Sequence, residues 1–185
     1  MVIAIDGPAG AGKSTVAREV AAKLGWTYLD TGAMYRCAAL RPGRDPRDLD
    51  IRFEGDRVLL DGEDVTEAIR TPAAAQAASR IATDPEVRAA LGDRQRALLR
   101  TGDWVAEGRD IGTVVKPDAE VKVWLTADPE ERAGRRGIPV DDLEARDLRD
   151  AARDHAPMVP APDAVCVDTT GVAIGDVVSR IVGLA

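Results

Sequence analysis

The sequence contains little cysteine, little histidine and few aromatic residues. Two of its 185 residues are cysteine, one is histidine, and aromatic residues make up only 3%. Cys37 and Cys166 lie far apart between apolar neighbours, so we expect two small buried side chains and neither a disulfide nor a catalytic thiol. The one histidine, His155, has no cysteine beside it, and we assign it no catalytic role. These absences argue against a disulfide-stabilised fold and against a Cys/His metal centre.

The sequence also lacks a long apolar run. A membrane-spanning helix needs roughly 20 predominantly apolar residues, and no stretch approaches that length. The apolar run at residues 2–5 is interrupted by Asp6, so it does not resemble a targeting segment. We therefore expect a cytoplasmic protein that has no membrane partner.

Acidic residues outnumber basic ones, 32 to 25, which gives a formal net charge of −7 at pH 7. Affinity for polymeric nucleic acid comes largely from an excess of Lys and Arg that neutralises backbone phosphates. We therefore expect no nucleic-acid polymer as a partner. A small phosphate-rich ligand would need a local cluster of cations instead.

Short apolar strands alternate with helical segments through most of the chain. The patterns predict strands at 2–6, 26–29, 104–107, 121–125 and 164–168 and helices at 14–24, 33–40 and 174–182. Such alternation is typical of an α/β fold, in which helices cover both faces of a parallel sheet.

Residues 41–101 have a different pattern. Residues 51–65 alternate as in small antiparallel hairpins. Two helices are predicted to begin at Thr71-Pro72 and Asp84-Pro85, because each pair places a capping side chain before a proline at the first helical position. We interpret 41–101 as a small subdomain inserted into a core formed by 1–40 and 102–185.

Residues 7–14 match the phosphate-binding pattern G-x-x-x-x-G-K-[S/T], placed between a predicted strand and a predicted helix. Its glycines let successive amide N–H groups converge on phosphate oxygens, and the helix adds the positive end of its dipole. Lys13 is suited to the β- and γ-phosphates of ATP, and the Ser14 hydroxyl to Mg²⁺. Asp6 and Glu107, which both end strands, stay open as the carboxylate that assists the metal. The predicted ATP-binding residues are Gly7, Pro8, Ala9, Gly10, Ala11, Gly12, Lys13, Ser14 and Thr15.

Three further blocks, taken together with the phosphate loop, resemble the bacterial cytidylate kinases. The blocks are Asp30-Thr-Gly-Ala-Met-Tyr-Arg36, Glu107-Gly-Arg-Asp-Ile-Gly-Thr-Val-Val115 with Pro117-Asp118, and Arg146-Asp-Leu-Arg-Asp150 leading to Arg153. They follow in the family's order and cover most of the chain. The resemblance implies a P-loop nucleoside monophosphate kinase that transfers the γ-phosphate of Mg·ATP to CMP or dCMP, giving CDP or dCDP.

The resemblance also implies roles for single residues in binding the acceptor nucleotide. Arg36 and Arg109 match positions that hold the acceptor phosphate, a task that suits planar guanidinium groups. Ser79 and Arg88 match the pair that reads cytosine. The full set of implied CMP-binding residues is Thr31, Tyr35, Arg36, Ser79, Arg88, Arg109, Asp110, Arg146, Asp150 and Arg153.

Residues 129–153 match the lid of such kinases, whose arginines meet the ATP phosphates. The catalytic residues implied by the resemblance are Lys13, Arg36, Arg109, Arg132 and Arg136. They would neutralise charge on the transferring phosphoryl group. Compared with what the resemblance leads us to expect, the segment between Arg136 and Arg146 is shorter, and the segment 41–70 is shortened as well.

The sequence is compatible with three alternative hypotheses about function. A related P-loop kinase for UMP, AMP or a non-nucleotide acceptor would share Lys13 but differ at Ser79, Arg88 and Asp110. A nucleotide-dependent switch is a second alternative, although the N-K-x-D segment of guanine-specific switches is absent. A degenerate kinase that has lost activity is a third. The resemblance to cytidylate kinases predicts a monomer whose partners are ATP and CMP or dCMP.

Overall fold

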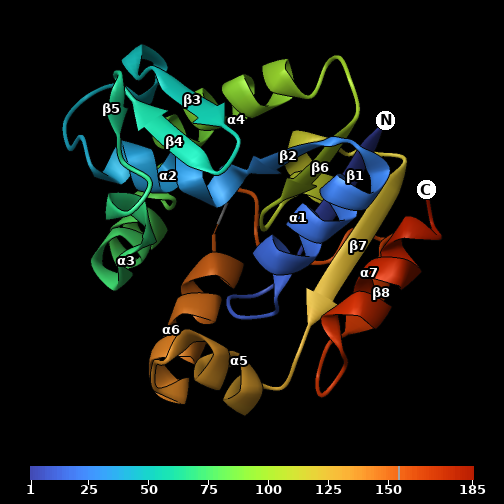
Figure 1. Cartoon of the computed structure of the whole chain (residues 1–185). Coiled ribbons are helices and arrows are strands. Elements are labelled where there is room, and N and C mark those ends of the chain that lie inside the picture. The colour runs from blue at the N-terminus through green and yellow to red at the C-terminus, as the bar shows by residue number, and fades with distance from the viewer. Residues whose placement is uncertain (154) are drawn as a thin grey trace. The chain divides into compact units, whose positions relative to one another are not determined.

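A computed structural model describes residues 1–153 and 155–185 (Figure 1). The chain forms two compact units, one made of Met1–Asp30 with Leu98–Ala185 and the other of Thr31–Ala97. The second unit begins earlier than the predicted insertion at residue 41. The difference arises because helix α2 (Thr31–Ala39) packs on helix α3 (Pro72–Ile81), so it clusters with the inserted segment.

The first unit is built on a five-stranded parallel sheet. Its strands, in spatial order, are β2 (Thr27–Asp30), β6 (Trp104–Glu107), β1 (Val2–Asp6), β7 (Val121–Thr126) and β8 (Val165–Asp168). All five residues of the central strand β1 are buried, as expected for a parallel strand covered on both faces. The predicted α/β architecture is confirmed, and the carboxyl end of β1 lies in the middle of one sheet edge.

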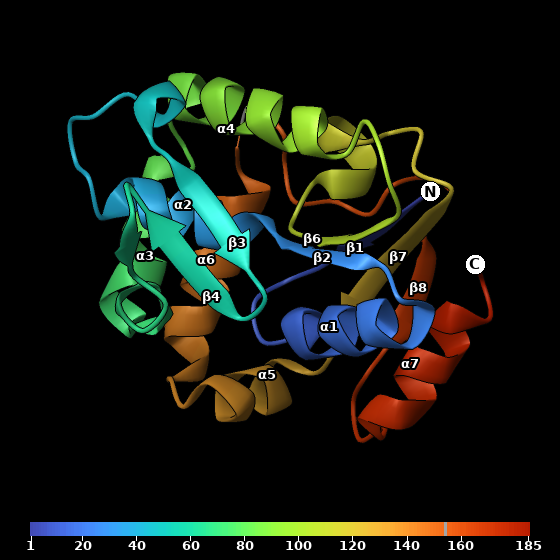
Figure 2. The same cartoon turned by 45° about the horizontal axis from the view of Figure 1, so that its top comes forward.

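Helices of the first unit follow the strands. They are α1 (Lys13–Leu24), α5 (Pro129–Arg136), α6 (Val140–Ala151) and α7 (Ile174–Val182), with one π-helical turn, η3 (Ile111–Val115). Helix α1 ends where predicted, at Gly25, whose φ of 70° gives the left-handed cap that favours glycine. Helices α1 and α7 pack against each other, as Figure 2 shows.

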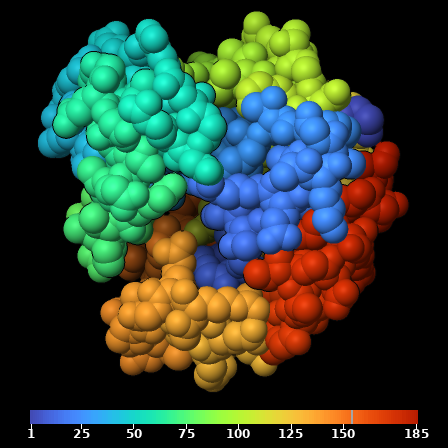
Figure 3. All heavy atoms as spheres, in the orientation of Figure 1, coloured from blue at the N-terminus to red at the C-terminus, as the bar shows by residue number. Residues whose placement is uncertain are grey.

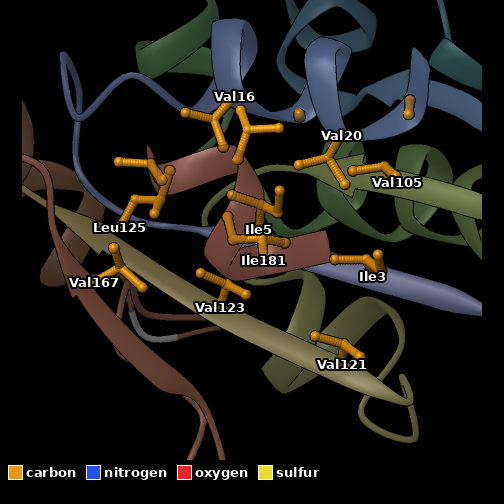
Figure 4. Packing of buried hydrophobic residues seen from close by; sticks show 14 of the residues in the cluster. Ile3, Ile5, Val16, Val20, Val105, Val121, Val123, Leu125, Val167 and Ile181 are labelled. Carbon is orange, nitrogen blue, oxygen red and sulfur yellow. The ribbon is translucent and has the colours of Figure 1, made fainter. Parts of the chain in front are cut away.

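The main core of this unit lies between the sheet and helices α1 and α7 (Figure 4). Val16 and Val20 are one helical turn apart on α1 and both face the sheet, where Ile5 of β1 is fully buried. Ile181 of α7 joins the same cluster. This packing fixes the two elements, β1 and α1, that flank the phosphate loop.

The second unit combines a small antiparallel sheet with helices. Its further elements are η1 (Pro46–Asp48), β3 (Ile51–Glu54), β4 (Arg57–Leu60), β5 (Glu63–Asp64), η2 (Ala68–Arg70) and α4 (Pro85–Leu98). The two predicted helix starts are confirmed. The Thr71 hydroxyl accepts from Ala74 N at 3.2 Å, and Asp84 Oδ1 accepts from Glu86 N at 2.8 Å.

One prediction about burial is wrong. Cys37 is buried, but Cys166 is exposed, because β8 is an edge strand and alternate side chains of its residues point to solvent. Separately, within the described residues, every helix is too short or too polar to cross a bilayer.

Candidate active site

The phosphate loop runs from the end of β1 to the start of α1. At Gly7, whose φ is 146°, a Cβ atom would lie 2.0 Å from the carbonyl oxygen of Leu125. At Gly10, whose φ is 78°, it would lie 2.5 Å from the carbonyl oxygen of Arg132. Both glycines are therefore required by close backbone approach as well as by conformation.

A cavity of about 350 Å³ opens beside this loop. It is lined by residues 10–16 and by Arg135, Arg136, Thr169, Val172, Ile174 and Val177. Figure 3 shows the orange atoms of the α5 region bordering the red atoms of the C-terminal segment. Val172 and Ile174 stay 42% and 46% exposed, so the cavity offers an apolar surface next to the loop. Nothing in the sequence marks these two residues, because they follow a strand without a recognisable motif.

Lys13 is buried at the N-terminus of α1, and its Nζ donates to Pro8 O at 2.7 Å. Burial, together with the nearby Arg109 and Arg136, holds the pKa of the Lys13 ammonium well below its usual range, while Glu107 and Asp6 act in the opposite direction. Three cations that repel one another beside a loop of amide groups form a site for a multiply charged anion.

Glu107 links three elements of the first unit. Its Oε1 accepts from the Tyr28 hydroxyl at 2.6 Å, and the carboxylate also accepts a hydrogen bond from Ser14. Burial and the charge of Asp30 raise the pKa of Glu107, whereas Lys13 and both hydroxyl donors lower it. The Arg18 guanidinium lies 5.0 Å from the centre of the Tyr28 ring. Tyr28 is an aromatic residue in a strand, and nothing in the sequence marks its contact with a site residue.

Asp6 holds the turn η3. Its Oδ1 accepts from Ile111 N at 2.9 Å and its Oδ2 from Gly112 N at 2.8 Å. Burial raises the pKa of this carboxyl to about 6 even though both amide bonds lower it.

This raised pKa predicts a dependence of stability on pH. Because the folded state holds the Asp6 proton more tightly than the unfolded chain, its contribution is favourable below about pH 4 and is lost as pH rises through 6. The loss amounts to about 3 kcal/mol over that interval. Denaturant unfolding of the wild type and of Asp6→Asn between pH 4 and 7 measures it as the difference between the two profiles. Parallel profiles would contradict the assignment.

Four of the predicted acceptor-site residues come together in the first unit. Arg109 Nε donates to Asp150 Oδ2 at 3.0 Å, and Arg153 forms an ion pair with Asp150 Oδ1. Burial would raise the pKa of Asp150, but the charges of Arg109, Arg153 and Arg146 hold it below its usual value. The carboxylate is therefore ionised and fixes the direction of two guanidinium groups. Asp110 is also buried in this unit, before η3.

The other predicted acceptor-site residues lie in the second unit. Thr31, Tyr35 and Arg36 are on α2, Ser79 on α3 and Arg88 on α4. The Arg88 guanidinium lies 5.9 Å from the centre of the Tyr35 ring. The Ser79 hydroxyl is buried and has no hydrogen-bond partner within the described residues. A buried, unpaired hydroxyl is the kind of group that a bound ligand satisfies.

The lid arginines have different surroundings. Arg132 is buried, and its guanidinium binds the carbonyl oxygens of Ala127 and Ala9 and the carboxylate of Asp147. Arg135, another arginine of the predicted lid, donates to Thr169 O at 2.9 Å and pairs with Glu131. Arg136 is exposed and lines the cavity.

Two solved kinase structures share the fold of this chain. A gluconokinase from Sinorhizobium meliloti 1021 matches with a TM-score of 0.58 at 14% identity, covering 99% of this chain and 90% of that chain. Shikimate kinase from Acinetobacter baumannii matches with a TM-score of 0.51 at 18% identity, covering 99% and 91%. At these identities the likeness shows the fold, which is that of a P-loop kinase.

Sequence relatives define the family. The cytidylate kinase family profile matches residues 3–185, and the chain belongs to the cytidylate kinase family. It is 49% identical to a cytidylate kinase from Pelotomaculum thermopropionicum, over 97% of this chain and 93% of the relative. It is 44% identical to one from Solibacter usitatus, over 96% and 88%. The resemblance drawn from the sequence blocks is thereby confirmed.

The first of these alignments runs over 211 positions, more than the 185 residues of the chain. The relative therefore carries residues for which this chain has no counterpart. In the structure, only residues 137–139 connect α5 to α6.

Proposed function

We propose that the protein is a cytidylate kinase that transfers the γ-phosphate of ATP to CMP or dCMP and releases ADP with CDP or dCDP. Family membership over nearly the whole chain supports this function. The observation that carries the chemistry is the convergence of Lys13, Arg109 and Arg136 on one phosphate loop. Such a cluster suits a polyphosphate better than any neutral ligand.

In the proposed ATP complex, the phosphates lie on the loop and the base lies in the adjoining cavity. The loop amides and the N-terminus of α1 bind the phosphate oxygens. Val172 and Ile174 then offer their exposed apolar surface to the flat adenine ring. Arg136, which lines the same cavity, is placed to reach the phosphates.

Ser14 and Glu107 fit a magnesium ion. Mg²⁺ favours oxygen ligands and is usually bound through one or two protein groups together with substrate phosphates. Ser14 is exposed at the loop, and its hydroxyl already contacts the Glu107 carboxylate. Both Asp6 oxygens accept backbone N–H bonds in η3, so we favour Glu107 over Asp6 as the assisting carboxylate. When bound, the ion would neutralise charge on the β- and γ-phosphates.

The transfer itself needs no protein nucleophile. An oxygen of the CMP phosphate attacks the γ-phosphorus, a new P–O bond forms, and the bond to the β-phosphate oxygen breaks in line. The acceptor phosphate is already anionic near neutral pH, so no general base is required. Lys13 stabilises the negative charge that develops, together with Arg109 and Arg136.

The acceptor would be read by polar groups of the second unit. Ser79 offers a buried hydroxyl with no hydrogen-bond partner among the residues that the structure describes, and Arg88 and Arg36 supply cations. A site built to hydrogen-bond one base rejects others, because a wrong base leaves its buried groups unpaired. We also retain as proposals that the protein is monomeric and acts in the cytoplasm.

The test is a panel of acceptors. Purified protein is incubated with Mg·ATP and, separately, with CMP, dCMP, UMP, AMP, GMP or no acceptor, and ADP release is followed. We expect rapid ADP formation with CMP or dCMP and only background hydrolysis without an acceptor.

Other outcomes would overturn the assignment in distinct ways. Faster turnover with UMP or AMP would identify a different nucleoside monophosphate kinase. No turnover with any acceptor, but tight ATP binding, would indicate a degenerate kinase or a switch.

A further inference from the structure

Most carbonyl groups of the phosphate loop accept hydrogen bonds from donors in the first unit. Pro8 O accepts from Lys13 Nζ, Ala9 O from Arg132 Nη1, Gly10 O from Arg135 Nη1, and Gly12 O from Val16 N, at 2.7, 3.0, 3.4 and 3.0 Å. The Thr169 hydroxyl is shared between Ala11 O at 3.2 Å and Thr126 O at 3.0 Å. Five successive carbonyls, at residues 8–12, therefore have donors.

This arrangement matters for anion binding. A carbonyl oxygen is the negative end of the peptide dipole, so it repels a phosphate, whereas an amide N–H attracts one. In a trans peptide group the N–H points opposite to the C=O, so a donor that fixes a carbonyl also fixes the direction of the amide in the same peptide group. The Ala9 amide, which shares its peptide group with Pro8 O, is itself held by Asp147. Amides that are oriented in advance need no rearrangement when the phosphates bind.

One ion pair holds the peptide groups on both sides of Ala9. Arg132 Nη1 donates to Ala9 O at 3.0 Å, while Asp147 Oδ1 accepts from Ala9 N at 3.2 Å. Arg132 and Asp147 are joined directly, and Arg132 Nε is anchored on Ala127 O at 2.9 Å. The two side chains are only 9% and 16% exposed, so solvent screens this contact little.

Packing brings the two helices that carry this pair against the loop. The backbone of Arg132 lies so close to Gly10 that no Cβ fits between them. Ala9, Ala133 of α5 and Leu143 of α6 form a separate buried apolar cluster, joined by Ile138 and Val140. Helices α5 and α6 are therefore part of the wall that shapes the loop.

We propose that Arg132 and Asp147 are positioning residues that orient the phosphate loop for ATP by fixing the peptide groups at Ala9. The proposal rests on the proposed ATP site. It gives Arg132 a different task from the direct phosphate contact that the sequence predicts, and it gives a role to Asp147, which the sequence does not single out.

The experiment compares matched variants in nucleotide binding and in turnover. Arg132→Lys keeps the positive charge but replaces the planar fork, and Asp147→Asn keeps the shape but removes the negative charge. The double variant tests whether the two act together. Arg149→Lys and Asp142→Asn, both exposed on α6, are the controls. ADP and ATP affinities are measured by calorimetry, and amide exchange of the segment around Ala9 by mass spectrometry.

We expect each single variant to weaken ADP and ATP binding by about tenfold or more. The double variant should be no weaker than the worse single variant. Amide exchange around Ala9 should accelerate while CMP affinity and the exchange of the β1 and β7 strands stay unchanged. The controls should behave as wild type.

Three outcomes would overturn the proposal. Wild-type ADP affinity in both variants would show that the pair does not shape the loop. A large loss of kcat in Arg132→Lys with unchanged ADP affinity and a silent Asp147→Asn would show a direct catalytic contact. Loss of protection throughout the sheet would show a purely structural pair. If the wild type itself bound neither nucleotide, the ATP site of the proposed function would be wrong instead.

Discussion

Lys13→Met should lower kcat by about a hundred- to a thousandfold. The ammonium at this position is the buried cation of the loop, and methionine has a similar length without a charge to offset that of the transferring phosphoryl group. The measurement is steady-state ADP release with saturating ATP and CMP. Because the lost interaction strengthens in the transition state, kcat should fall much more than the KM values rise.

The matched control is Lys23→Met, which makes the same change in the exposed last turn of the same helix. It should leave turnover unchanged. Burial lowers the pKa of Lys13, which shows that its charge is costly in the folded state, so Lys13→Met should melt at or above the wild-type temperature. Near-normal turnover in Lys13→Met, or a collapse of its melting temperature, would contradict the role given to this residue.

Arg36→Ala should raise KM for CMP by about ten- to a hundredfold and leave KM for ATP nearly unchanged. The residue lies on α2 in the second unit, whereas the loop that is proposed to bind ATP belongs to the first unit. Loss of a guanidinium that pairs with the acceptor phosphate should therefore affect one substrate only. Initial rates with each substrate varied in turn measure both constants.

Arg80→Ala provides the comparison for Arg36→Ala, since Arg80 is exposed on α3 of the same unit. Its kinetic constants should match those of the wild type. Equal increases in both KM values for Arg36→Ala would mean that the acceptor and donor sites have been assigned wrongly.

Local sequence signals predicted much of the fold. Strand β1 and helix α1 were predictable because an apolar β-branched run, a glycine-rich loop and a helical period follow one another within 25 residues. The starts of α3 and α4 were predictable for a similarly local reason, the capping side chain before a proline. The phosphate loop could be recognised because its function constrains neighbouring residues.

Features that depend on distant contacts were not predictable. Cys166 is exposed because β8 is an edge strand. The local periodicity of a sequence predicts where strands lie along the chain but not their order in the sheet. The contact of Tyr28 with Glu107 joins residues 79 positions apart, and an aromatic in a strand gives no sign of it. The contacts of Arg132 were missed for the same reason. The sequence shows an arginine that could lie near the phosphate loop, but it does not show whether the guanidinium binds phosphate or backbone carbonyl groups.

The donors that hold the loop carbonyls also affect when the site forms during folding. Residues 9–11 depend on side chains that are 123, 125 and 158 positions further along the chain. Contacts of such long sequence separation form late, because a large part of the chain must be ordered first. A growing chain that has emerged only as far as α4 would contain the whole G-x-x-x-x-G-K-S motif without the groups that shape it. We therefore expect nucleotide affinity to be among the last properties acquired in folding, so nucleotide should slow unfolding more than it speeds folding.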